Sequence, residues 1–153
     1  MDLPPFQKLI DAHGHDVLRF LAATVGPQDA EDCWQETFLS ALAGYPRLTH
    51  ADNLRSWLFT IAHRKAMDVH RKRTRRSEVF GTVETGTVDP PGTPDDGLWG
   101  RVRSLPPKQR AAVVHRYVND LAYREIAQVM ESTPEAARRN VHEGLKRLRE
   151  AIA

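Results

Sequence analysis

The residues with the clearest capacity for chemistry are cations gathered near the middle of the chain. From position 64 to position 76 the sequence is RKAMDVHRKRTRR, with a single acidic residue. Such a cluster attracts polyanions, because each neutralised phosphate releases condensed counterions. A solvated helix end, where cations complement the helix dipole, is the plainer alternative, but this density exceeds what capping needs. We interpret the cluster as a nucleic-acid surface, formed by Arg64, Lys65, His70, Arg71, Lys72, Arg73, Arg75 and Arg76.

A second set of cations follows a short break near the end of the chain. Glu131-Ser132-Thr133 separates two helical patterns, and Thr133 with Pro134 is a good start for the second one. Two helices with a three-residue break match the helix-turn-helix spacing, in which the second helix enters the major groove. A plain charged face is the alternative. The apolar stripe at positions 137, 141, 145, 148 and 152 turns outward Arg138, Arg139, Asn140, His142 and Lys146.

Other chemistry is poorly supported by the sequence. His13 and His15 are two apart on a predicted helix, so they point to different faces and cannot easily share an ion. Cys33 is the single cysteine, which rules out an internal disulfide, and it lies on an apolar stripe. No glycine-rich phosphate loop, nucleophile elbow or spaced zinc motif is present. We therefore expect a protein that is not an enzyme and has no cofactor and no metal site.

Composition agrees with a binding protein but does not identify one. The chain has 153 residues, 41% hydrophobic and 27% charged, with a formal net charge of only +2. The mild excess of cations is therefore informative only through its distribution. The first residues lack a signal peptide, and no stretch approaches the roughly 20 apolar residues of a membrane span. We expect a soluble, cytoplasmic protein without membrane contact.

The elements that must position these cations are all helices. Helical periods begin at Phe6, after Gly26-Pro27, and after Asp52 or Asn53; they resume from Leu98 to the end. Between them, residues 77–97 are rich in Gly, Pro, Thr and acidic residues, which indicates a flexible linker. The prediction is an all-α protein with two small domains, 1–76 and 98–153, joined by this linker.

Two of the predicted helices have informative faces. The second carries an apolar stripe at Ala30, Cys33, Trp34, Thr37, Phe38, Ala41, Leu42 and Tyr45. This stripe leaves an acidic and amide surface to the solvent, with Asp29, Asp32, Gln35 and Glu36 on it. The third helix has its stripe at Leu54, Trp57, Leu58, Ile61, Ala62 and Val69. Phe59 and His63 lie opposite, where a partly exposed aromatic ring suits stacking on an unpaired base. A plain core role for Phe59 is equally compatible with the pattern.

Four segments resemble a known family. DAEDCWQETFLSAL, LRSWLFTIAHRKAMDVHR, LPPKQRAAVVHRYVNDLAYREIAQVM and GLKRLRE are similar to extracytoplasmic-function sigma factors of the sigma-70 superfamily. The resemblance covers nearly the whole chain outside the linker, in the family's order and spacing. It implies a transcription initiation factor with a domain that opens the −10 element and a helix-turn-helix domain that recognises the −35 element.

The resemblance also implies roles for individual residues. Asp29, Asp32, Gln35 and Glu36 match the motif that docks on the coiled coil of the polymerase β′ subunit. Positions 47–53, including Arg47 and Asn53, match the loop that captures a flipped −10 base. Phe59, His63 and Arg64 match the strand-separating helix, and we add Arg71 from the basic cluster to the −10 surface. Positions 134–149 match the −35 recognition helix, in a domain that also contacts the β flap. Core RNA polymerase, promoter DNA and an anti-sigma factor are the partners that the resemblance implies.

The recognition helix departs from the family pattern. Glu135, Ala136, Ala137, Arg138, Arg139 and Asn140 stand where the family usually has Gly-Thr-Val-Lys-Ser-Arg. Glu143 replaces a usual basic residue, and Glu131 replaces a usual turn glycine. These changes bear on the exact −35 sequence recognised.

Two alternatives stay open at this point. One is a helix-turn-helix repressor or activator whose N-terminal domain dimerises or senses a ligand. The other is an anti-sigma-type or scaffolding protein. The acidic and amide surface of the second helix argues against the first, and two separate cationic helices argue against the second.

Overall fold

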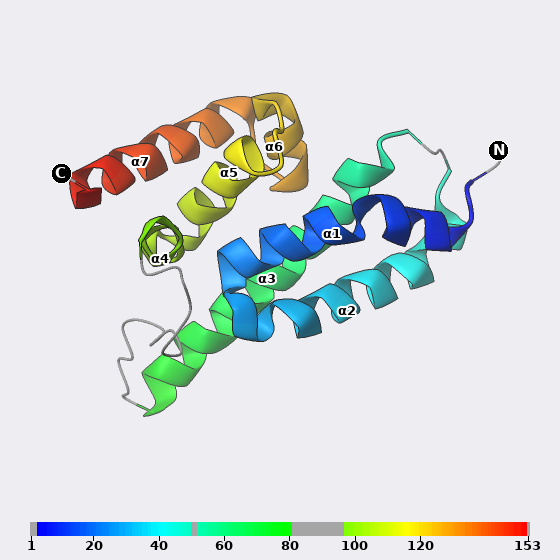
Figure 1. Cartoon of the computed structure of the whole chain (residues 1–153), viewed down its shortest axis with the longest axis horizontal. Coiled ribbons are helices and arrows are strands. Elements are labelled where there is room, and N and C mark those ends of the chain that lie inside the picture. The colour runs from blue at the N-terminus through cyan, green and yellow to red at the C-terminus, as the bar shows by residue number, and fades with distance from the viewer. Residues whose placement is uncertain (1–2, 50–51, 81–96, 153) are drawn as a thin grey trace.

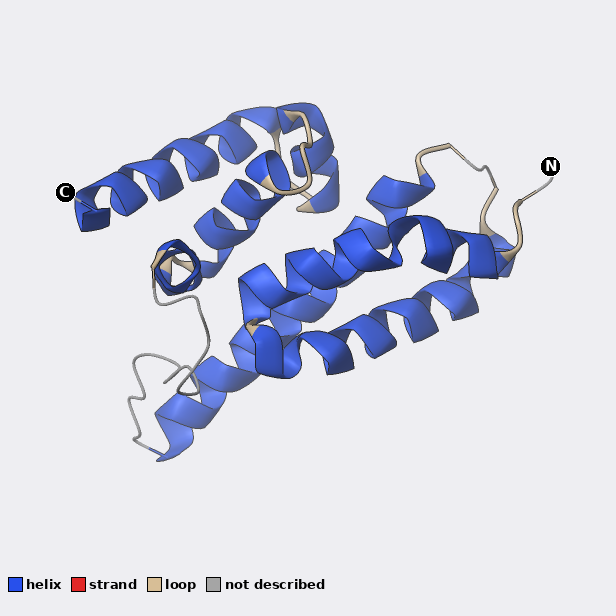
Figure 2. Ribbon diagram, viewed as in Figure 1, coloured by secondary structure: helices blue, strands red, loops and turns tan. Residues whose placement is uncertain are grey.

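The computed structural model describes residues 3–49, 52–80 and 97–152, and the regular elements in these ranges are all helical (Figure 2). The N-terminal module consists of α1 (Phe6–Val25), α2 (Pro27–Gly44), the short 3-10 helix η1 (Tyr45–Arg47) and α3 (Leu54–Phe80). In Figure 1, α1 and α2 lie side by side, and both pack against α3. The predicted all-α architecture is confirmed.

Local residues set the boundaries of these helices. Gly26 has φ of 97°, a conformation that glycine tolerates, and Pro27 then begins α2. The side chain of Asn53 accepts a hydrogen bond from the Ser56 amide at 3.2 Å, so Asn53 rather than Asp52 caps α3. The indole of Trp34 donates to the Gly14 carbonyl at 2.8 Å, and this contact fixes α2 against α1.

The C-terminal module begins after the gap in the described residues. It consists of α4 (Leu98–Ser104), α5 (Pro107–Tyr117), α6 (Tyr123–Val129) and α7 (Pro134–Ile152). The Thr133 hydroxyl accepts a hydrogen bond from the Ala136 amide at 3.1 Å and caps α7, as predicted. Helices α6 and α7 pack on each other and on α5, so the expected helix-turn-helix arrangement is present.

The structure departs from two expectations about the chain's organisation. The linker was expected to begin at residue 77, but α3 continues as a helix to Phe80, and residues 81–96 lie outside the described residues. Leu42, expected on the apolar stripe of α2, is 51% exposed, because it lies at the edge of the stripe beyond the reach of α1 and α3.

The two modules pack against each other over a shared core. Helix α1 contacts α4 and α5, while α3 contacts α5 and α6. Phe20, Phe59 and His115 are completely buried where these helices meet. Around this core, the Arg110 guanidinium donates to the Thr24 carbonyl at 2.6 Å, and Arg55 donates to the Asn119 carbonyl at 2.9 Å.

Candidate nucleic-acid and partner interface

The acidic and amide surface of α2 is exposed, with one exception. Asp32, Gln35 and Glu36 face the solvent, as expected. Asp29 is half-buried and forms an ion pair with Arg73, which also donates to the Val25 carbonyl at 2.7 Å. Asp29 therefore fixes the C-terminal part of α3 to the junction of α1 and α2, and is less available to a partner than its three neighbours.

Sequence reasoning missed an apolar part of this surface. Leu39 is 66% exposed and lies one turn after Gln35 and Glu36, and Leu42 extends it by a further turn. A polar patch with an exposed apolar extension is typical of a protein-binding surface. The available signal was the position of Leu39, four residues after Gln35 and off the apolar stripe.

Cys33 lies beneath this surface and is unsuited to redox chemistry. It is buried, and burial together with the nearby Glu36 and Asp29 carboxylates raises the pKa of its thiol. A raised pKa suppresses the thiolate, which is the reactive form. Cys33 thus acts as a small core residue, as its place on the apolar stripe predicted.

The residues predicted to separate the DNA strands are covered in this arrangement. Phe59 is completely buried and His63 is 7% exposed, so the interpretation of Phe59 as a partly exposed ring does not hold here. The Phe59 ring lies edge-on to Phe20 and to His115, with both centroid distances 5.9 Å, and the Arg55 guanidinium lies 4.9 Å from its centroid. The C-terminal module therefore covers this face of α3.

Histidines concentrate at the same junction. The ring centroids of His63 and His115 are 5.7 Å apart, and the amide nitrogen of Asn119 lies 3.2 Å from Nδ1 of His115. Burial lowers the pKa of His63 to about 4, although the Glu131 carboxylate opposes the shift. Burial also lowers the pKa of His115 well below its usual value. Both rings are therefore neutral at pH 7.

Some polar atoms at this junction lack protein partners. Among the described residues no hydrogen-bond partner exists for Ser56 Oγ, His63 Nδ1, His115 Nε2 or Asn119 Oδ1, all of which are buried. A buried polar atom without a partner typically costs about 1–3 kcal/mol. Separation of the modules would return these atoms to water, so the junction is better suited to a reversible contact than an apolar junction of the same size.

The basic cluster of α3 is partly neutralised within the chain. Arg64 forms an ion pair with Glu131 across the junction, Arg71 with Asp68, and Arg73 with Asp29. Arg64 and Arg71 nevertheless keep more than 60% of their side chains exposed. Lys72, Arg75 and Arg76 are exposed and have no hydrogen bond or ion pair to any described residue. The nucleic-acid surface predicted here is thus largely accessible, but His70, which was counted in it, is only 8% exposed and does not belong to it.

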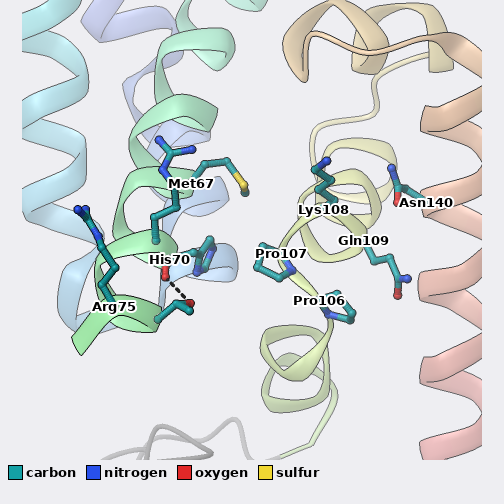
Figure 3. A pocket seen from close by; sticks show the side chains of 10 residues that line it. Met67, His70, Arg75, Pro106, Pro107, Lys108, Gln109 and Asn140 are labelled. Carbon is teal, nitrogen blue, oxygen red and sulfur yellow. Dashed lines mark hydrogen bonds between the residues drawn. The ribbon is translucent and has the colours of Figure 1, made fainter. Parts of the chain in front are cut away.

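A cavity of about 900 Å³ lies beside this cluster, between the C-terminal part of α3 and the start of α5. Figure 3 shows Met67 and His70 of α3 across from Pro107, the first residue of α5, and Pro106 before it, with Asn140 of α7 beyond them. Burial, and next the Arg110 guanidinium, lower the pKa of His70 to about 3. The modules are therefore in contact around His115 and again at His70, where Nη1 of Arg110 lies 3.4 Å from Nε2 of the ring, and the cavity opens beside this second contact.

The predicted −10 loop is only partly described. Arg47 ends η1 and is exposed, and Asn53 is exposed while its side chain caps α3. Residues 50 and 51, between them, lie outside the described residues.

The predicted recognition helix presents its cations to the solvent. Arg138, Arg139, His142 and Lys146 are exposed on α7, whereas Asn140 is half-buried beside the cavity. Glu143 accepts a hydrogen bond from the Gln109 side chain at 3.3 Å. We call the arrangement in which the two modules are in contact the closed arrangement. In it the cationic face of α7 is accessible to duplex DNA, whereas Phe59 and His63 are covered and are not accessible.

Two other kinds of site find no support in the described ranges. No group of three or more His, Cys, Asp or Glu residues there is arranged to hold a metal ion. No helix in the described ranges is long and apolar enough to cross a bilayer.

Comparison with known proteins gives consistent matches over most of the chain. Residues 9–76 match the family described as Sigma-70 region 2, and residues 97–148 match Sigma-70, region 4. RNA polymerase sigma factor CarQ of Myxococcus xanthus is 32% identical, over 96% of this chain and 88% of CarQ. ECF RNA polymerase sigma factor SigX of Bacillus subtilis is 27% identical, over 94% of this chain and 81% of SigX.

Solved structures share the fold. The sigma factor RpoE of Bartonella quintana, in complex with the anti-sigma factor NepR, superposes with a TM-score of 0.83 at 21% identity, over 98% of both chains. CnrH, in complex with the cytosolic domain of CnrY, gives a TM-score of 0.70 at 20% identity, over 96% of this chain and 86% of CnrH.

Proposed function

This chain belongs to the sigma-70 family as an extracytoplasmic-function factor, and from that membership we propose which of its surfaces bind RNA polymerase and which bind promoter DNA. Its function is to direct core RNA polymerase to promoters at the start of transcription, and it is not itself an enzyme. The observation that carries this conclusion is the match of both conserved regions, in order, on a chain whose helix-turn-helix presents an open cationic face.

The surface of α2 is the proposed polymerase contact. Asp32, Gln35 and Glu36 form its exposed polar part, and Leu39 adds an apolar anchor. These side chains fit the coiled coil of the β′ subunit. Asp29 belongs to the same motif, but its ion pair with Arg73 suggests that it supports the surface from behind. The β flap is the proposed partner of the C-terminal module.

The proposed −10 surface combines accessible and covered residues. Arg47, Asn53, Arg64 and Arg71 can reach DNA in the closed arrangement, since all four are exposed. Phe59 and His63 can do so only after the C-terminal module leaves α3. We therefore assign duplex binding to the first group, and stacking on separated strands to the second group after opening.

The cationic face of α7 is the proposed −35 reader. Its first turns enter the major groove, where Arg138, Arg139 and Asn140 reach base edges or phosphates. His142 and Lys146 lie further along the same helix and are suited to contacts with the DNA backbone.

The same family membership supports two further proposals, one on a regulatory partner of this chain and one on its location. RpoE and CnrH are each found with a protein partner, the anti-sigma factor NepR and the cytosolic domain of CnrY respectively. We propose an anti-sigma partner for this chain too, and place it in the cytoplasm with the polymerase. We also propose that residues 1–76 and 98–153 are its two working domains, which separate when the polymerase binds.

Binding to purified core polymerase tests the polymerase contact. Asp32→Arg and Gln35→Arg should each abolish co-purification with core polymerase, because each places a cation on an exposed acidic and amide surface. Neither side chain is buried, so helical content by circular dichroism should not change. Asp11→Arg, the same change of charge as Asp32→Arg at an exposed position of α1, is the matched control and should bind normally.

Normal polymerase binding by both Asp32→Arg and Gln35→Arg would refute this contact. Loss of binding by the Asp11→Arg control to the same degree would show that charge alone, and not this surface, is responsible.

A further inference from the structure

One ring in the helix-turn-helix contacts two arginines. Tyr123 is the first residue of α6 and is half-buried, and its position is fixed by the Ala122 amide, which donates to the Glu125 carboxylate at 3.2 Å. The guanidinium carbon of Arg116 lies 4.5 Å from the centre of the Tyr123 ring, and that of Arg138 lies 5.2 Å from it. Both distances lie within the roughly 6 Å range of a cation–π interaction.

The two arginines differ in how they are held. Arg116 lies in the last turn of α5 and donates a hydrogen bond to the Leu121 carbonyl at 3.1 Å, so it is anchored to the segment that leads into α6. Arg138 projects from the first turns of α7 and has no hydrogen bond or ion pair to any described residue. The Tyr123 ring is therefore the contact that restrains the Arg138 side chain.

The neighbouring Arg139 provides an internal comparison. It is also exposed on the start of α7, but it has no ring contact, hydrogen bond or ion pair with any described residue. A free arginine side chain loses much rotamer freedom when it is fixed on a ligand, and a side chain that is already held loses less. Of the two arginines, Arg138 is thus the one whose guanidinium is already oriented, so it is better suited to a contact of defined geometry.

The charges around the ring indicate what Arg138 would contact. Because Arg116 lies near the same ring, two cations are close together. They favour a partner that offers several hydrogen-bond acceptors. Guanine offers two acceptors, O6 and N7, in the major groove, and their spacing matches the planar guanidinium fork. The fork also fits a phosphate, but a phosphate contact carries no sequence information, so an effect on one base position distinguishes the two.

We propose that Tyr123 is a positioning residue for promoter discrimination, whose ring holds Arg138 in the orientation that recognises one base of the −35 element. This inference rests on the proposed function, since it requires α7 to be the promoter-reading helix. Tyr123 itself touches no base in this account and acts only through Arg138.

Transcription by the reconstituted holoenzyme from a library of −35 sequences tests the proposal. Tyr123→Leu, which removes the π system, should reduce discrimination about two- to fivefold at one base position. That position should be the one affected by Arg138→Ala. Tyr123→Phe should keep full discrimination, because the ring and not the hydroxyl makes the contact. Tyr123→Leu combined with Arg138→Ala should discriminate no worse than Arg138→Ala alone.

Three results would overturn the proposal. Tyr123→Leu could reduce output equally from all sequences, which would mark a merely structural role. Tyr123→Phe could lose as much discrimination as Tyr123→Leu, or the affected position could differ from that of Arg138→Ala. Tyr117→Leu, the same substitution at an exposed tyrosine of α5, is the matched control and should alter no base preference.

The design separates this proposal from the assignment of α7 on which it rests. If Arg138→Ala and Arg139→Ala both leave sequence preference unchanged, α7 is not the promoter reader, and the role of Tyr123 fails with it. If Arg138→Ala changes a preference and Tyr123→Leu does not, α7 keeps its role and only the positioning role of Tyr123 is excluded.

Discussion

The imidazole of His115 stacks on the phenyl ring of Phe20, with ring centroids 4.3 Å apart and planes 16° from parallel. The two residues belong to different modules, α5 and α1, and both are completely buried. This stack joins the N-terminal module to the C-terminal module and places Phe59 beneath α5. The contact between the modules is therefore centred on His115, and this histidine is neutral.

Acidification should separate the modules. In the closed arrangement the pKa of His63 is about 4, that of His70 about 3, and that of His115 well below its usual value. After separation the rings would regain values near 6.5 and bind protons more readily. The closed arrangement is thus fully stable above pH 6.5 and is progressively lost as the pH falls from 6.5 towards 4.

The charged groups around these rings mostly act in the same direction. Arg64 and Glu131 face His63, Arg110 and Arg73 face His70, and Arg55 faces His115. Among the described residues, only Glu131 favours a protonated ring, that of His63. Small-angle X-ray scattering between pH 7.5 and 5 should show an increase in the radius of gyration, smaller in His63→Gln. The exposed His142→Gln is the control, and constant dimensions over this range would contradict the prediction.

Contact between the modules should depend on His115 far more than on the ion pair nearby. His115→Ala leaves a cavity between Phe20 and Phe59, and such truncations of large buried side chains cost about 2–5 kcal/mol. Glu131→Gln removes the ion pair with Arg64, whose side chains are 62% and 58% exposed, and pairs of this kind contribute about 1 kcal/mol or less. Urea unfolding should show a larger loss of unfolding free energy for His115→Ala than for Glu131→Gln. Equal losses in the two variants would argue against a core centred on His115.

Gly144 is closely packed against α5, so Gly144→Ala should lower the stability of the protein. A Cβ atom there would lie 2.7 Å from Cγ2 of Val113 and 3.4 Å from the Gln109 carbonyl oxygen. Alanine favours the helix by about 1 kcal/mol, but overpacking costs about 1–3 kcal/mol, and a short valine side chain cannot move aside. We expect a net loss of thermal stability, relieved when Val113→Ala is added.

Gly44 is the matched control for this substitution. Its Cβ would meet only Cζ2 of Trp57, at an ordinary 3.5 Å, so Gly44→Ala should be neutral or slightly stabilising. A Gly144→Ala variant as stable as the wild type would show that α7 can shift away from α5.

Helix positions followed from the sequence because local residues determine them. Thr133 caps α7 and Asn53 caps α3 through contacts three residues away, and such short-range signals are visible in a sequence. The sequence left a core role and an exposed role for Phe59 equally open, because His115, which covers it, lies 56 positions further along the chain. The ion pair of Asp29 with Arg73 was missed for the same reason, since 44 positions separate its partners.

Glu143 should weaken DNA binding without reading a base. Its carboxylate lies on the cationic helix α7 and already accepts a hydrogen bond from Gln109, so it is poorly placed to accept one from a cytosine amino group as well. Glu143→Ala should therefore strengthen holoenzyme binding to all −35 sequences alike, by removing repulsion of phosphate. Binding measured across the −35 library tests this, and loss of preference at a single position would show that Glu143 contacts a base.

Run-off transcription with purified core polymerase tests the central claim most directly. Promoter fragments with randomised −10 and −35 elements would serve as templates, with and without this chain. We predict discrete transcripts from a subset of fragments only when the chain is present, and none with Asp32→Arg. On duplex DNA alone the chain should bind weakly. Tight binding to duplex DNA without polymerase, together with no promoter-specific transcript, would contradict its role as an initiation factor and favour a repressor.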